Sequence, residues 1–97
     1  MSVVVTHTFR LVAGADEAAF RRADARLQVE VYYGQPGLVR RTTARGSEGE
    51  WLVVTLWRSG DDAATGAERA RDHPLTAEFL AHVDATSMSV GRYETLD

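Results

Sequence analysis

Histidine is the side chain best suited to acid–base chemistry at neutral pH, and this sequence has three: His7, His73 and His82. His7 alternates with apolar residues along an expected strand, so it is either a general base or a core histidine hydrogen-bonded to a neighbour. His73 stands before Pro74, where a helical region breaks. There it either lines a cleft or lies at the surface beside the start of the next helix.

The three histidines could also converge on a metal ion, although they lie far apart in the sequence. The chain has no cysteine, so disulfides and thiolate metal ligands are excluded. It also lacks a paired-histidine metal motif, a nucleophile elbow and a glycine-rich phosphate loop. We therefore expect no metal site and no bound cofactor.

Large rings would complete a site for a planar ligand. Trp57 shares a strand face with Trp51, and Tyr32 and Tyr33 end the first expected helix. An indole stacks on an aromatic substrate or simply fills the core. A phenol orients a hydroxylated ring, or covers the core while its hydroxyl stays in water.

Two arginines, Arg10 and Arg41, lie within expected strands, where an unpaired buried charge is costly. Either could stabilise a developing oxyanion or enolate. Either could instead pair with Glu50 or Glu94 across the sheet or a dimer. Pairing is the interpretation we prefer for both.

The hydrophobic pattern predicts alternating strands and amphipathic helices in a fixed order. The expected elements are a strand over 3–12, a helix from Asp16 to about Tyr33, strands over 38–45 and 50–58 around a turn at 46–49, a weak helix to about residue 72, a second helix from Pro74 and a strand over 86–94. This β-α-β-β-α-β order predicts an α+β, ferredoxin-like fold with an antiparallel sheet, as one domain over residues 1–97.

Along the strand over 50–58, Trp51, Val53 and Trp57 alternate with Leu52, Val54 and Leu56. Neither set is polar, so both faces of the strand should be buried. One layer of helices covers only one face of a sheet. We therefore expect a second copy of the chain to cover the other face, in a homodimer.

The net charge is −3, and the two signs are interleaved. No basic block marks a nucleic-acid partner. No stretch approaches the ~20 apolar residues of a membrane span, and no signal peptide is recognisable, so we expect a cytoplasmic protein. All eleven basic residues are arginine, which with abundant alanine, glycine and valine is typical of a GC-rich actinobacterial source.

Three segments carry a family resemblance: Gly34-Gln35-Pro36-Gly37-Leu38, Leu56-Trp57-Arg58-Ser59 and His73-Pro74-Leu75-Thr76-Ala77-Glu78-Phe79. They resemble the antibiotic-biosynthesis-monooxygenase-like proteins of the dimeric α/β-barrel superfamily, and the order of elements matches over nearly the whole chain. The resemblance implies two sheets packed face to face in a dimer, with a ligand cleft between the sheet and the helices of each protomer.

Members of that family include cofactor-independent oxygenases of aromatic polyketides, haem-degrading oxygenases and isomerases. The haem-degrading branch uses an asparagine on the first strand, and a tryptophan and a histidine in the second helical region. This chain has no asparagine, the tryptophan position falls near Gly66 and Ala67, and only His82 could match. The haem-degrading branch is therefore the least similar.

We accordingly expect a cofactor-independent monooxygenase acting on aromatic, polyketide-like substrates. An isomerase or cyclase using the same cleft, and a non-catalytic dimeric ligand-binding or assembly domain, are the alternatives. We assign catalysis to His7 and His73, and substrate binding to Tyr33, Trp57, Arg41 and His82. Of these, His7, His73, Tyr33 and Trp57 should approach a common pocket between the sheet and the helices.

Overall fold

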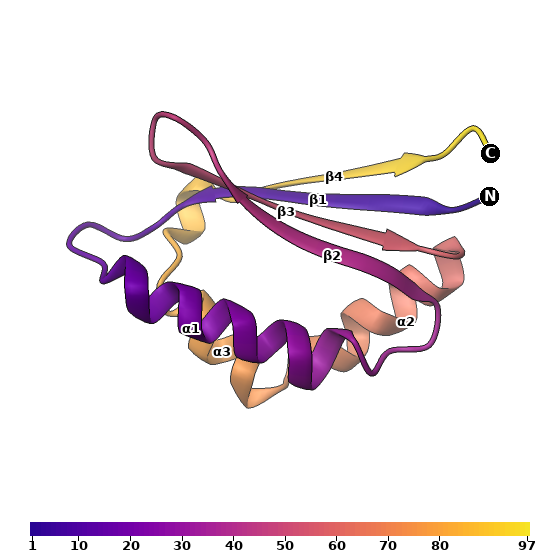
Figure 1. Cartoon of the computed structure of the whole chain (residues 1–97), viewed down its shortest axis with the longest axis horizontal. Helices are drawn as coiled ribbons and strands as arrows, with labels where there is room; N and C mark the ends of the chain where they lie inside the picture. Colours follow the sequence, from indigo (N-terminus) through magenta and orange to yellow (C-terminus); the bar gives the residue numbers. More distant parts are fainter.

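The chain folds into a four-stranded antiparallel sheet whose three α-helices all lie on one side (Figure 1). The computed structural model describes all 97 residues. Its elements are β1 (Val3–Arg10), α1 (Glu17–Leu27), the π-helix η1 (Gln28–Tyr32), β2 (Leu38–Arg45), β3 (Glu50–Trp57), α2 (Gly60–Arg71), α3 (Pro74–Leu80), the 3-10 helix η2 (Ala85–Ser87) and β4 (Ser89–Glu94). The predicted α+β, ferredoxin-like fold is confirmed.

The strand order is β2-β3-β1-β4, so the two central strands are β3 and β1. His7 lies directly opposite Val53, and Phe9 lies opposite Trp51. Because side chains alternate along a strand, these four residues share the sheet face that meets the helices.

Each of the three α-helices is preceded by a residue whose side chain satisfies free backbone N–H groups. The side chain of Asp16 accepts from the N–H groups of Ala18 and Ala19, as its expected N-cap role requires. Ser59 caps α2. His73 caps α3, whose first residue is the proline that cannot continue α2.

Three strand boundaries differ from the prediction. β3 ends at Trp57 rather than at residue 58. β1 ends at Arg10, and Leu11 forms only an isolated bridge to Val83. The last strand begins at Ser89 rather than near Thr86, because the Asp84 side chain caps the short helix η2 there.

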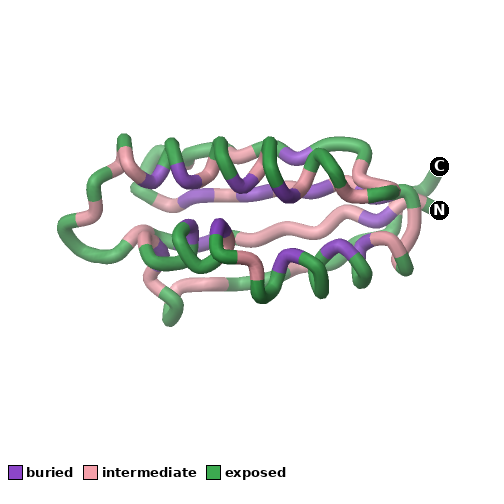
Figure 2. Tube along the Cα trace, turned by 90° about the horizontal axis from the view of Figure 1, so that it is seen from below, coloured by how far each residue is buried: buried purple, intermediate pink, exposed green.

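Aromatic rings make up the centre of the core, and Figure 2 shows buried positions recurring along α1. Phe20 of α1 is fully buried and meets Trp51, Phe79 and Phe9 at ring-centroid distances of 4.9, 5.3 and 5.9 Å. A second, smaller cluster joins Trp57 to Val3 and Ala63 of α2. The core thus has two parts, one beneath α1 and α3 and one beneath α2.

The outer face of the sheet carries no helix (Figure 1). Along β3 the residues facing the helices are buried, whereas Leu52, Val54 and Leu56 on the outer face are only half-buried. Burial of both faces is therefore not achieved within one copy of the chain. None of the helices has the length and apolar character needed to cross a membrane.

Candidate functional site

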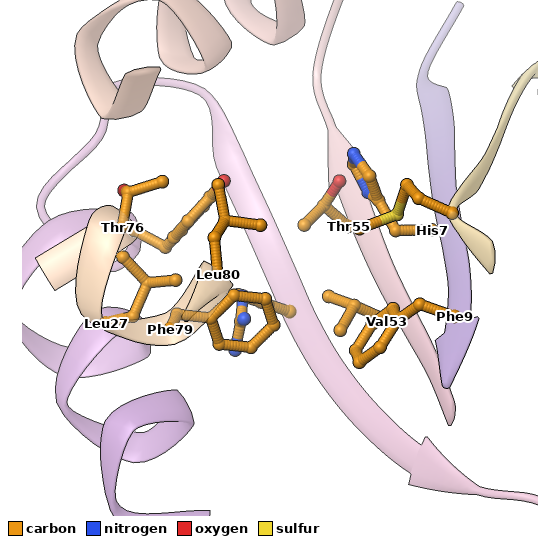
Figure 3. Close-up of a pocket in the computed structure, with 11 residues that line it drawn as sticks. His7, Phe9, Leu27, Val53, Thr55, Thr76, Phe79 and Leu80 are labelled. Atoms are coloured by element: carbon orange, nitrogen blue, oxygen red, sulfur yellow. The ribbon is translucent and has the colours of Figure 1, made fainter. Parts of the chain in front are cut away.

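A cavity of about 160 Å³ lies between the sheet and the helices α1 and α3. We call it the main cavity; its lining residues are His7, Phe9, Leu27, Tyr32, Arg41, Val53, Thr55, Thr76, Phe79, Leu80 and Met88. Figure 3 shows the labelled side chains of the helices facing those of the strands across it. The walls are mostly apolar, with a few polar groups among them, which is the usual character of a small-molecule site.

His7 reaches the main cavity because its strand position faces the helices. The imidazole makes no hydrogen bond to any other group of the chain, so both ring nitrogens remain free. Burial lowers the pKa of His7, and the nearby positive charge of Arg41 lowers it further. The ring is therefore neutral at physiological pH and is able to accept a proton.

Arg41 is a cation buried in the cavity wall, only 3% exposed. Its Nη2 donates to Asp24 Oδ1 at 2.8 Å, and its Nη1 donates to Gln28 Oε1 at 3.1 Å and more weakly to Thr43 Oγ1 at 3.4 Å. These contacts tie β2 to α1 and η1. They hold the guanidinium in one orientation.

The expected pairing of Arg41 with Glu50 or Glu94 is wrong. Arg41 lies opposite Thr55 in the sheet register, so its side chain points toward the helices, where Asp24 meets it. For Arg10 the pairing prediction holds, since its Nη2 lies 3.8 Å from Glu50 Oε2. That pair is solvent-exposed and contributes little to stability.

A π-helical turn decides which tyrosine enters the site. The N–H of Tyr33 donates to the carbonyl of Gln28 at 2.9 Å, five residues back, so α1 widens at its end. Tyr32 lines the main cavity, and its ring faces the Arg41 guanidinium. The distance from the ring centroid to the guanidinium carbon Cζ is 5.0 Å. Burial raises the pKa of Tyr32, although Arg41 opposes the shift, so the phenol stays protonated. Tyr33 is 54% exposed and does not line the cavity.

A second hollow of about 40 Å³, the side cavity, lies beside the main one beneath α2. His7, Tyr32 and Thr55 line both cavities, whereas Trp57 lines the side cavity and not the main one. The Trp57 indole N–H donates to Thr55 Oγ1 at 3.0 Å.

Little room is left around that indole. A β-carbon at Gly66 of α2 would overlap it, so this glycine lets the helix lie directly on the ring.

The other two histidines lie outside both cavities. His73 Nδ1 accepts from the N–H of Leu75 at 3.1 Å, which is its helix-capping contact. His82 packs edge-on against Phe20 with ring centroids 6.1 Å apart. Of the six residues assigned from the sequence, His7 and Arg41 meet in the main cavity and Trp57 lies alongside. The predicted common pocket of His7, His73, Tyr33 and Trp57 is wrong for His73 and Tyr33, which line neither cavity, whereas His7 and Trp57 both line the side cavity. The roles assigned to all six residues stay predictions.

Nine of the eleven residues that line the main cavity were not assigned as site residues from the sequence: Phe9, Leu27, Tyr32, Val53, Thr55, Thr76, Phe79, Leu80 and Met88. Thr55 lies two residues before Trp57, so alternation along the strand predicts that both side chains share one face of the sheet. Phe79 lies four residues after Leu75, and this helical spacing predicts that both side chains face the core. Nothing in the sequence indicated that Met88 or Thr76 would border a cavity. No cluster of three or more histidine, aspartate or glutamate side chains has the spacing of a metal site.

No protein-family model matches the sequence, and no curated protein matches it significantly. Solved structures do share its fold. A candidate antibiotic biosynthesis monooxygenase from Caulobacter crescentus is 18% identical with a TM-score of 0.81, over 99% of this chain and 91% of that one. A mutant of SnoaB, a cofactor-independent oxygenase from Streptomyces nogalater, is 18% identical with a TM-score of 0.80, over 99% and 94%. A candidate antibiotic biosynthesis monooxygenase from Bordetella bronchiseptica is 14% identical with a TM-score of 0.78, over 98% and 97%. These structures confirm the α+β, ferredoxin-like fold of the single chain.

Proposed function

We propose that this chain is a small-molecule enzyme of the cofactor-independent monooxygenase kind, acting on a planar, phenol-like substrate in the main cavity. The observation that carries the proposal is the meeting of a neutral imidazole and a buried guanidinium in one apolar enclosure. A base beside a fixed positive charge is the pairing needed to form and hold a conjugated oxyanion. The structural likeness to SnoaB, named a cofactor-independent oxygenase, supports the same kind of chemistry.

In the proposed reaction, His7 takes a proton from a hydroxyl or an activated C–H of the substrate. Arg41 stabilises the negative charge that develops on the conjugated oxygen. The electron-rich anion reduces O₂ and combines with it to form a hydroperoxide at carbon. Loss of water then leaves a new carbonyl, so the substrate and O₂ give a ketone or quinone and H₂O. The proton held by His7 returns to the peroxide oxygen when the hydroperoxide forms. The substrate loses two hydrogens, either both from one CH₂ carbon or one from a ring carbon and one from its hydroxyl, one oxygen atom enters the product, and the substrate supplies all the electrons.

The size of the main cavity limits how much of a substrate it encloses. A dry, apolar cavity of about 150 Å³ accommodates one benzene molecule, and the main cavity measures about 160 Å³. One aromatic ring would therefore be buried beside His7. Any further rings of a larger substrate would extend toward the mouth, where Leu80 is 47% exposed.

We also propose that the functional unit is a homodimer with the outer faces of two sheets packed together. The supporting observation is an apolar strip on the uncovered face: Val4, Leu52, Val54 and Leu56 are half-buried, and Tyr93 is 59% exposed. A chain of 97 residues without cysteine has a thin core, and burial of this strip would reinforce it.

Oxygen uptake in the presence of hydroxylated one- and two-ring aromatics tests the proposed activity. We expect uptake with one mole of O₂ consumed per mole of product. His7→Gln should lower the rate by about 10²-fold or more, the usual contribution of a general base. Thr65→Val, an exposed site on α2 that lines neither cavity and lies away from the outer sheet face, is the control and should retain the rate.

An isomerase or cyclase is the second candidate, because the same imidazole and guanidinium would suffice for moving a proton without O₂. Product formation that continues under strict anaerobiosis and still depends on His7 would favour that reaction. Ligand binding without any turnover would instead favour a non-catalytic domain and would contradict the proposed monooxygenase.

A further inference from the structure

Two buried polar atoms on the main-cavity residues have no hydrogen-bond partner. They are Arg41 Nε on β2 and Thr76 Oγ1 on α3, and no other buried side-chain nitrogen or oxygen of the chain is unpartnered. Both residues line the main cavity. Buried polar groups in folded proteins are nearly always paired, so two unpaired atoms on the lining of one cavity require an explanation.

Arg41 cannot turn its free N–H toward another protein group. Its two terminal nitrogens are already engaged by Asp24, Gln28 and Thr43. The guanidinium is planar and rigid, so these contacts also fix the direction of the Nε–H bond. Tyr32 and Phe79 flank the guanidinium carbon at 5.0 and 5.9 Å from their ring centroids, and neither makes a hydrogen bond with Nε.

Thr76 is unusual for a threonine within a helix. Such a hydroxyl either points into solvent or bonds back to a carbonyl of the preceding turn. Thr76 Oγ1 makes no such bond and is nonetheless buried. It lies on the cavity-lining side of α3 together with Phe79 and Leu80, opposite the wall that carries His7 (Figure 3).

We propose that Arg41 Nε and Thr76 Oγ1 form a subsite for one oxygen atom of the ligand, a ring keto or phenolate oxygen. Arginine only donates hydrogen bonds, so its partner must be an acceptor, and the threonine hydroxyl is free to add a second donated bond. A charge-assisted bond to the guanidinium favours an oxyanion over a neutral hydroxyl.

This inference rests on the proposed function, and it specifies the substrate further. Since Thr76 and His7 lie on opposite walls, the ring oxygen is bound away from the proton that His7 removes. The negative charge therefore has to travel through a conjugated ring from the His7 side to the Arg41–Thr76 side. Unconjugated alcohols and ring systems without an acceptor oxygen would be excluded as substrates.

The test uses 2,6-difluorophenol, which has one ring, one oxygen and fluorine signals that report ionisation by ¹⁹F NMR. Its counterpart 1,3-difluorobenzene is the same ring without the oxygen. We expect the phenol to bind as phenolate at neutral pH and at least about tenfold more tightly than the benzene, the gain from one charge-assisted hydrogen bond.

Thr76→Val keeps the shape of the side chain and removes only its hydroxyl. This substitution should weaken the affinity for the phenolate about tenfold and leave the affinity for 1,3-difluorobenzene unchanged. Arg41→Lys removes the Nε–H and should shift the bound ligand toward its neutral form. Thr65→Val, at an exposed site on α2, is the matched control and should change the affinity for neither ligand.

Equal affinity of the wild-type protein for the two ligands would overturn the subsite, as would a phenolate affinity that Thr76→Val leaves intact. Thr76→Val keeps the test valid even if Arg41→Lys does not fold. The outcome is also separate from the proposed reaction. Selective phenolate binding without any O₂ uptake would refute the monooxygenase and retain the subsite. O₂ uptake that Thr76→Val does not change would refute the subsite and retain the monooxygenase.

Discussion

Two threonines that line the main cavity should respond in opposite ways to the same substitution. Thr76 Oγ1 is buried and unpartnered. Thr55 Oγ1 accepts from the Trp57 indole at 3.0 Å and donates to the Val5 carbonyl at 3.4 Å. Valine has nearly the same shape as threonine, so each substitution removes a hydroxyl with little change in packing.

The expected magnitudes follow from these partners. A buried polar group without a hydrogen bond costs about 1–3 kcal/mol, so Thr76→Val should raise the free energy of unfolding by about 1 kcal/mol. Thr55→Val leaves the buried indole N–H of Trp57 without an acceptor, so this substitution should lower the free energy of unfolding by about 1–3 kcal/mol. For a domain of this size, 1 kcal/mol corresponds to about 4–8 °C in Tm.

Urea and thermal unfolding, followed by tryptophan fluorescence and circular dichroism, would measure both variants against the wild type. A Thr76→Val protein that is more stable yet binds phenolate less tightly would show that stability is sacrificed for a ligand at this position. A Thr76→Val protein destabilised as much as Thr55→Val would refute the reasoning, because it would mean that the Thr76 hydroxyl is already satisfied.

Three further predictions concern packing, pH and assembly. Gly66→Ala should lower the free energy of unfolding by about 1–3 kcal/mol in urea titrations despite the better helix propensity of alanine, because the new methyl group overlaps the Trp57 indole; an unchanged midpoint would contradict that packing. Because the pKa of His7 is lowered in the folded chain, the unfolded chain binds a proton there more readily than the folded chain. The free energy of unfolding should therefore fall as the pH drops below about 6.5, and His7→Gln should make this fall smaller. The same pH dependence of unfolding in wild type and His7→Gln would count against a buried neutral imidazole. Sedimentation equilibrium should give twice the 10.7 kDa chain mass. Val54→Arg on the outer sheet face should reduce the mass to that of one chain, and Val29→Arg at an exposed position of η1 should not. A monomeric wild type would rule out the dimer.

The order of elements was predictable because it depends on local patterns. Alternation of apolar residues in β1 and β3, and their helical recurrence at Ala19, Phe20, Ala23, Leu27 and Val31, identified each element before any contact was known. Four of these five helical residues are buried, and Ala19 is half-buried. The same alternation placed His7 and Trp57 on the sheet face that meets the helices. Boundaries were less predictable, because caps such as Asp84 compete with the strand pattern at its ends.

The site itself depends on contacts between residues distant in the sequence. Asp24 and Arg41 are 17 residues apart, and no local pattern distinguishes this carboxylate from Glu50 or Glu94 as the partner. The choice of Tyr32 over Tyr33 depends on one backbone hydrogen bond that turns the end of α1 into a π-helix.

Residue types and their periodicity were therefore sufficient for the α+β fold, the helix-facing sheet surface and the presence of a base on it, because each follows from side-chain polarity and backbone geometry within a single element. The cavity, the locked orientation of Arg41 and the two unpartnered polar atoms exist only after β2, α1 and α3 have packed together. Whether a polar atom is satisfied depends on every group around it, and those groups come from elements that the sequence does not place side by side.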